Sequence, residues 1–294
     1  MSSWERGIIS NYDLKKPRVK IGYVIMCLFI VLLGVTMLYP FLNTLFSSLK
    51  TKQEMFTFPV PFFPKEWIWH NYVEAWDTMN LLPYMRNTII IFVGNMVFSI
   101  FFMGLAAYSL SHLKVPYRKW FILFFLSTLL IPTNSYLIPN FLNLQSLGLL
   151  NSYWAFWLPA GANAFNLLLL KTFFDGIHKE LFEAARVDGA SEIRCYLQLA
   201  IPLSLPIIAT LVILGFSATW NEWYWPSLVI TSKEKYPLAT VIYRYVIAGG
   251  VGGTQIPWNV RFALLASAML PPVVFFLFMQ KYIMRGLNVS GIKG

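Results

Sequence analysis

Long, uninterrupted apolar runs constrain this chain more than any other feature. A helix needs about twenty apolar residues to cross the hydrocarbon core of a bilayer. The strands of a transmembrane β-barrel would instead alternate apolar and polar residues. Because these runs are continuous, we predict an all-α polytopic membrane protein with six transmembrane helices. The predicted spans are 21–47, 87–111, 120–140, 152–172, 201–224 and 259–282.

The composition agrees with this class. Of the 294 residues, 57% are hydrophobic and 12% charged, whereas roughly a quarter of the residues are charged in an average soluble domain. We expect a cytoplasmic segment at 1–20 and a single transmembrane domain at 21–294, which leaves no room for a soluble catalytic domain. The first run is too long for a signal-peptide core and no small-residue cleavage site follows it, so we expect a retained anchor.

The distribution of basic residues predicts the orientation. With six spans, fifteen of the 23 Lys and Arg residues fall on the side that carries both termini, and eight fall on the other side. Cytoplasmic loops carry the excess of Lys and Arg, so we place both termini in the cytoplasm. The outer loops are then about 48–86 and 225–258. Prolines lie inside several spans, where they predict kinks around a pathway; they are Pro132, Pro159, Pro206, Pro271 and Pro272.

The most polar internal segment lies between the fourth and fifth spans. Residues 183–202 read EAARVDGASEIRCYLQLAIP. We predict a helix over 179–187, a left-handed residue at Gly189 that ends it, and a second helix that starts at Ser191. On the first helix, Leu181, Ala184 and Ala185 are predicted to share one face, and Glu183 and Arg186 are spaced for an i,i+3 pair.

Two interpretations of this segment are open. A helix that is small on one face and charged on another is suited to docking in a groove of a partner protein. A helix that rests on lipid headgroups would instead carry a basic face opposite bulky apolar residues. Acidic residues at 180, 183, 188 and 192 favour the docking interpretation, because anionic headgroups repel them.

Several classes of function find no support in the residues. The sequence has no GxxxxGK[ST] phosphate loop, so we do not expect this chain to hydrolyse ATP. We expect no bound metal, since His70, His112 and His178 lie in three separate loops and there is no HExxH. We expect Cys27 and Cys195 to be structural. No basic run is interleaved with aromatics, so we expect no nucleic acid partner.

The polar segment resembles the EAA loop of the permease subunits of binding-protein-dependent ATP-binding-cassette (ABC) importers. Glu183-Ala184-Ala185 and Gly189 match that pattern in place, and the terminal I-x-L-P element reads Leu199-Ala200-Ile201-Pro202, with its proline kept. The sequences NTIIIF, AAYSLS, EAARVDGAS, WNEW and QKYIMRGLNVSGIKG are similar to the maltose-transporter type, the second permease subunit of oligosaccharide importers. This resemblance spans about residues 20–294.

The resemblance implies a set of partners. They are a second permease subunit in a heterodimer, two cytoplasmic ATPase subunits that bind ATP and Mg, and an extracytoplasmic solute-binding protein. It also implies a non-catalytic subunit without a cofactor of its own, in a bacterial inner membrane. The EAA loop, about 173–200, would fit a cleft in the ATPase. The ATPase-coupling residues would be Glu183, Ala184, Ala185, Asp188 and Gly189.

The resemblance also directs attention to two sets of pathway residues. In the maltose type, the outer loop before the last span reaches into the binding protein, and Gly249, Gly250, Gly252 and Gly253 lie in that place; a floppy connector is the alternative. Sugars are bound by aromatic faces and by amide or carboxylate groups. The candidates are Asn134, Tyr136, Asn140, Asn163, Asn166, Trp220, Asn221 and Glu222, each of which could instead serve in interfacial belts or interhelical hydrogen bonds.

The prediction from sequence is therefore an importer permease for an oligosaccharide or a glycan fragment. A stand-alone secondary carrier or channel for a small polar solute is the alternative, in which the polar segment would merely connect two spans. A membrane-embedded enzyme lacks any acid/base or metal constellation. Proton-coupled carriers usually keep acids within the membrane, whereas Glu222 is the only acidic residue near the end of a span here.

Overall fold

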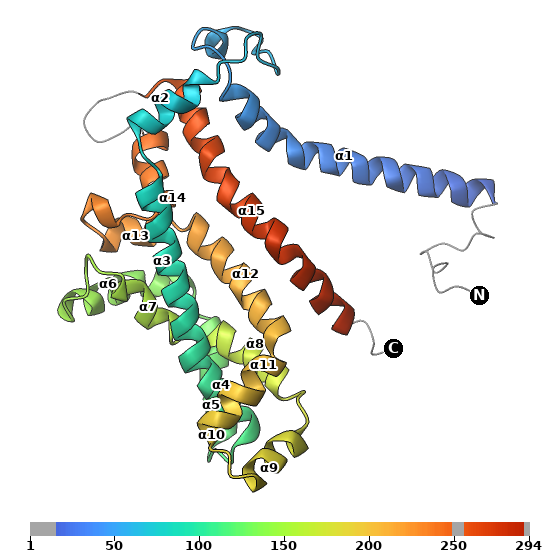
Figure 1. The fold of residues 1–294 in the computed structure, drawn as a ribbon, viewed down its shortest axis with the longest axis vertical. Helices are drawn as coiled ribbons and strands as arrows, with labels where there is room; N and C mark the ends of the chain where they lie inside the picture. Colours follow the sequence, from blue (N-terminus) through green and yellow to red (C-terminus); the bar gives the residue numbers. More distant parts are fainter. Residues whose placement is uncertain (1–15, 249–255, 291–294) are drawn as a thin grey trace. The chain divides into compact units, whose positions relative to one another are not determined.

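A computed structural model describes residues 16–248 and 256–290, and in that part of the chain every regular element is a helix (Figure 1). The described residues fall into two compact units. The first comprises the N-terminal part to Thr78 together with Pro257–Ala266, and the second comprises Met79–Ile256 together with the residues from Ser267.

In the first unit, α1 (Pro17–Ser47) begins with Pro17 at a first-turn position, where a missing amide costs nothing. Its most apolar window has no residue buried within the chain. The short helix η2 (Glu54–Phe56) and α2 (His70–Thr78) follow. The carboxylate of Glu54 accepts hydrogen bonds from the amides of Thr51 at 2.9 Å and Lys65 at 2.7 Å, which fixes the loop between α1 and α2.

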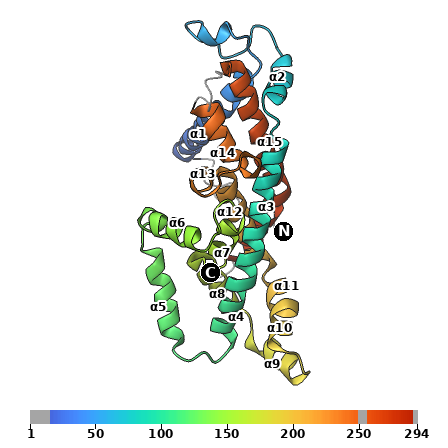
Figure 2. The ribbon, with the colours of Figure 1, turned by 90° about the vertical axis from the view of Figure 1, so that its left-hand side faces the viewer.

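The second unit is built along one long helix made of α3 (Leu82–Phe98), the π-helical turn η3 (Ser99–Met103) and α4 (Gly104–His112). Next come α5 (Arg118–Leu129), η4 (Thr133–Tyr136) and α6 (Leu137–Ser146). Figure 2 shows α5 leading from the α4 end back to α6. Then α7 (Trp154–Ala160) packs on α3, and α8 (Ala164–Phe174) packs on α4.

The remaining elements of this unit follow in chain order. They are α9 (Lys179–Val187), α10 (Glu192–Cys195), η5 (Tyr196–Ala200), α11 (Ile201–Leu203), α12 (Leu205–Asn221), α13 (Tyr224–Val229), η6 (Lys233–Lys235), α14 (Leu238–Val241) and η7 (Ile242–Ile247). Among them, α12, α14 and η6 contact α3. The last helix, α15 (Trp258–Ser290), runs through both units. In Figure 1, α9 and α10 lie at the α4 end of the long helix and α13 and α14 lie toward its α3 end.

Two predicted spans are broken where prolines interrupt the backbone. The chain bends by 96° between Leu129 and Thr133, where Pro132 disfavours the helical conformation of the residue before it. It bends by 77° at Ser204, where Pro206 lacks an amide and its ring opposes the carbonyl four residues earlier. The predicted span 152–172 is also divided, into α7 and α8.

The described residues contain three single helices long and apolar enough to cross a membrane, or up to five such spans if each bent pair counts as one. The single helices are Pro17–Ser47, Leu82–His112 and Trp258–Tyr282. The chain is thus a helical, multi-pass membrane protein, while the expectation of six spans is not confirmed by length and composition.

Candidate functional site

The EAA segment, residues 173–200, folds as predicted in its local structure. Helix α9 covers Lys179–Val187, and Gly189 has φ +82°. The amide of Gly189 bonds to the carbonyl of Arg186 and that of Ala190 to Ala185, which is the Schellman pattern of a helix end. The Ser191 side chain then caps α10 by accepting a hydrogen bond from the amide of Arg194.

Phe182 fastens α9 to the rest of the second unit. Its side chain is fully buried and lies among Tyr108 and His112 of α4 and Phe174 of α8. The ring centroids of Phe182 and His112 are 4.1 Å apart. One face of α9 is thus held by the core, and the opposite face is left exposed.

The exposed face of α9 combines acidic and small residues. Glu180, Glu183, Ala184 and Val187 are exposed and recur at helical spacing. Val187 is 88% exposed, which is unusual for an apolar side chain on a polar helix. Ala185 is half-buried against the core, so the two alanines differ, and the prediction that both lie on one docking face is wrong for Ala185.

The predicted pair of Glu183 with Arg186 is also wrong. Arg186 instead reaches across the turn to Glu192, with Nε–Oε1 at 2.7 Å and Nη2–Oε2 at 3.3 Å. The hydroxyl of Tyr108 donates to the same carboxylate at 2.7 Å. Because Arg186 faces the turn and not its own helix surface, no described residue pairs with the carboxylate of Glu183.

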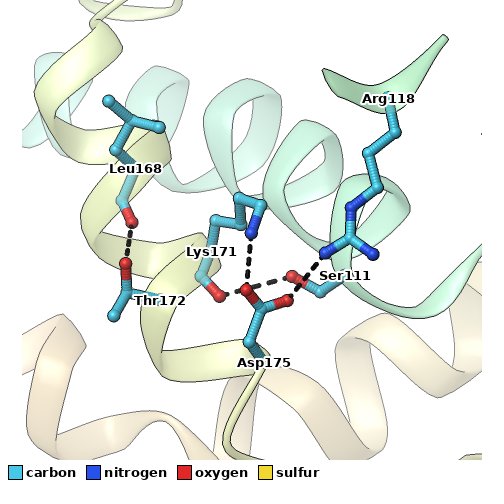
Figure 3. Close-up of polar contacts among 6 residues, drawn as sticks. All are labelled: Ser111, Arg118, Leu168, Lys171, Thr172 and Asp175. Carbon is cyan, nitrogen blue, oxygen red and sulfur yellow. Dashed lines mark hydrogen bonds and ion pairs between the residues drawn. The ribbon is translucent and has the colours of Figure 1, made fainter. Parts of the chain in front are cut away.

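A second charged cluster lies just before α9, at the end of α8 (Figure 3). Asp175 forms ion pairs with Lys171 one turn earlier and with Arg118 at the start of α5, the latter at 3.1 Å. The hydroxyl of Ser111 donates to the carbonyl of Lys171. Burial by itself would raise the pKa of Asp175, but hydrogen bonding and the charges of Lys171 and Arg118 outweigh it, so the pKa lies below its ordinary value.

The remaining coupling candidates are exposed. Asp188 ends α9 as its C-cap and is exposed, like Gly189. A Cβ added at Gly189 would meet no atom within 4 Å, so only the backbone conformation demands glycine there.

Several of the predicted substrate residues have local structural contacts, and their role in a substrate pathway stays a prediction. Asn163 caps α8 by accepting from the amide of Asn166 at 3.0 Å, and Asn221 donates to the carbonyl of Ser217. Glu222 accepts from the amides of Tyr224 and Trp225 and so starts α13. Asn134 and Tyr136 are exposed in η4, and Trp220 is 7% exposed and stacked on Phe216.

The four glycines proposed to contact a binding protein, Gly249, Gly250, Gly252 and Gly253, lie outside the described residues. The described part of the loop at about 225–258 is held to α3 by hydrogen bonds. Asn87 donates to the carbonyls of Glu234 and Tyr236, and the amide of Leu238 donates to Thr88.

Sequence reasoning missed the residues that hold the EAA segment in place. Phe182 could have been found as the one aromatic residue of α9, but the roles of Tyr108, Asp175 and Glu192 depend on contacts between distant elements. Asn151 was missed too. Its backbone has φ +55°, and its side-chain oxygen accepts from the amides of Thr231 and Ser232.

Helix α9, which exposes the side chains of Glu180 and Glu183, thus belongs to a helical, multi-pass membrane protein. The comparisons specify the class. A family model described as the binding-protein-dependent transport system inner membrane component matches residues 20–289, and the chain belongs to this family.

Individual relatives match nearly the whole chain. The probable ABC transporter permease protein YurM of Bacillus subtilis (strain 168) is 31% identical over 95% of this chain and 92% of its own length. The polygalacturonan/rhamnogalacturonan transport system permease protein YtcP of the same organism is 28% identical, over 90% and 96%. The fold matches a chain in the crystal structure of a bacterial ABC transporter involved in the import of the acidic polysaccharide alginate, with a TM-score of 0.83 and 24% identity over 91% of this chain and 98% of that chain.

Proposed function

We propose that this chain is one of two permease subunits of an ATP-driven importer for oligosaccharides or glycan fragments. It would form the translocation pathway with the second permease. Two ATPase subunits, which bind ATP and Mg, would drive its conformational change. The chain itself would bind no cofactor. The relative named for the transport of polygalacturonan and rhamnogalacturonan, and the transporter involved in the import of alginate, support the class of substrate.

The exposed face of α9 carries this proposal. Phe182 is buried in the core and Arg186 is paired with Glu192, so these three residues fix the position of the helix. Glu183, Ala184 and Val187 face outward, where a small side chain between a carboxylate and an apolar residue permits close approach of another protein. Glu183 would supply a charged contact to the ATPase, and Gly189 would set the docking angle of α9.

The orientation belongs to the same proposal. The excess of Lys and Arg on the side of the EAA segment favours the cytoplasm for that segment and for both termini, and six spans would complete the topology. In this arrangement the loops at about 48–86 and 225–258 face outward, in the inner membrane of a bacterium. A separate solute-binding protein would deliver substrate to that side.

Reversal of charge at Glu183 tests the proposal. The variant Glu183→Lys in the reconstituted complex should retain assembly in the membrane but lose stimulation of ATP hydrolysis by the loaded binding protein. The matched control is Glu66→Lys, which reverses another exposed glutamate in the first unit. Normal stimulation in Glu183→Lys would contradict the assigned contact. A wild-type chain that moves solute alone, without any ATPase, would favour the secondary carrier.

A further inference from the structure

Two π-helical turns in the second unit meet through one hydrogen bond. The first, η3 (Ser99–Met103), interrupts the long helix made of α3 and α4, and the second, η5 (Tyr196–Ala200), follows α10. The hydroxyl of Tyr196 donates to the carbonyl of Ile100 at 2.5 Å. Tyr196 is 1% exposed. The carbonyl of Ile100 thus accepts from Tyr196 in addition to the backbone amide of Gly104. A π-turn interrupts the regular hydrogen bonding of its helix, and such turns are frequent at functional sites.

Gly104 provides the space for this contact. A Cβ at Gly104 would lie 2.1 Å from the Tyr196 hydroxyl oxygen and 3.1 Å from the ring carbon that carries it. Even alanine at 104 would therefore displace the hydroxyl from Ile100. The glycine and the tyrosine fit each other as a pair.

A second element contacts the same turn. The side-chain amide of Asn166 on α8 donates to the hydroxyl of Ser99 at 2.7 Å. Helix α8 leads into α9, and α10 with η5 leads out of it. The segments before and after α9 thus contact consecutive residues of η3, Ser99 and Ile100.

Contacts connect this turn with α9 itself. Arg186 on α9 holds Glu192, Glu192 accepts from Tyr108, and the Tyr108 ring lies 5.8 Å from the Tyr196 ring between centroids. The line of contact is continuous from the exposed helix to η3. Energetic coupling between distant sites is carried by packed side chains and hydrogen bonds of this kind where they join elements with two arrangements.

We propose that η3 is the joint at which a displacement of α9 enters the long helix α3–α4, and that Tyr196 is the positioning residue that holds η5 to this joint. The inference rests on the proposed function, in which an ATPase moves α9. It adds a defined point of entry for that motion within the membrane-spanning part.

The first experiment measures amide hydrogen exchange of η3 in the chain alone, reconstituted in nanodiscs. The variant Tyr196→Phe removes one hydroxyl and should raise exchange in residues 99–104 by about threefold or more, while residues 16–47 stay unchanged. The matched control is Tyr72→Phe, which removes a hydroxyl bonded at 2.7 Å to Ser48 in the first unit. Equal exchange at 99–104 in Tyr196→Phe and wild type would overturn the proposal, as would failure of the variant to fold.

The second experiment uses the assembled complex and tests whether a displacement of α9 changes hydrogen exchange at η3. With ATP and vanadate to close the ATPase pair, wild type should change its exchange at both 179–187 and 99–104. Tyr196→Phe should keep the change at 179–187 and lose most of the change at 99–104. A full response at 99–104 in this variant would overturn the proposal. If exchange at 179–187 did not change in wild type, the proposed function would be contradicted. The experiment on the chain alone would still test whether Tyr196 stabilises η3.

A pair of substitutions distinguishes a specific joint from general packing. Gly104→Ala should reproduce the defect of Tyr196→Phe, because its methyl group displaces the hydroxyl. The double variant Gly104→Ala with Tyr196→Phe should behave nearly like Tyr196→Phe alone, since the oxygen at 2.1 Å is gone and the ring carbon at 3.1 Å has to move only slightly. Additive defects in the double variant would contradict a shared mechanism.

Discussion

Arg186 and Glu192 face each other across the turn at Gly189, with the guanidinium Nε 2.7 Å from the carboxylate Oε1. Tyr108 donates to the other oxygen of that carboxylate. The pair closes α9 against α10, and the tyrosine ties both to α4. Arg186 is therefore paired within the chain, and the carboxylate of Glu183 on the exposed face of α9 has no partner among the described residues.

Charge reversal at this pair should disturb the exposed helix without unfolding the chain. Arg186→Glu places two carboxylates together and should abolish stimulation of the ATPase by the binding protein. The exchanged pair, Arg186→Glu with Glu192→Arg, should recover part of the stimulation because the attraction returns, though not the contact with Tyr108. An assay of stimulated hydrolysis in the reconstituted complex checks both. If the double variant were as inactive as the single one, the attraction between residues 186 and 192 would not be required for stimulated ATP hydrolysis.

The turn at Gly189 gives a second prediction. A non-glycine residue in the left-handed region costs about 1–2 kcal/mol, and asparagine tolerates it better than a branched residue. Gly189→Asn should thus retain most coupled ATP hydrolysis, whereas Gly189→Val should lose it. The matched control is Gly148→Val, since Gly148 also has positive φ and open space around it but lies at the end of α6. Equal loss of coupling in both valine variants would assign the effect to general instability.

Local patterns in the sequence predicted α9, the left-handed Gly189 and the Ser191 cap, because each depends on a few neighbouring residues. The Arg186–Glu192 pair could not be predicted in the same way. An i,i+3 spacing to Glu183 was available on the helix, and the competing partner is brought close only by the turn. Kinks were predicted at Pro132 and Pro206, and the chain does bend at both places, but apolar composition alone does not separate a kinked span from a sharply bent pair of helices. The prolines indicated the places but not the angles.

Phe182 should be the residue on which the position of α9 depends most. Truncation of a buried phenylalanine to alanine costs about 3–5 kcal/mol in a protein core, so Phe182→Ala should lower the thermal stability of the purified chain and release α9. Leu181→Ala is the matched control, because Leu181 is its neighbour and is 47% exposed. Hydrogen exchange of residues 179–187 should rise in Phe182→Ala and not in Leu181→Ala. The same stability in both variants would contradict the anchoring role.

Asp175 gives a prediction on pH. Its folded-state pKa lies below the ordinary value of 3.8, because Lys171 and Arg118 outweigh the effect of burial. A carboxyl group with a lowered pKa stabilises the folded state above its unfolded pKa, and this contribution is lost as the pH falls through the folded value. Asp175→Asn should thus be less stable than wild type at about neutral pH, by a small amount since the carboxylate is partly exposed. The two proteins should converge well below pH 3.8. Thermal unfolding of both in nanodiscs across that range would check it, and a constant difference at every pH would show that the asparagine acts through packing and not through charge.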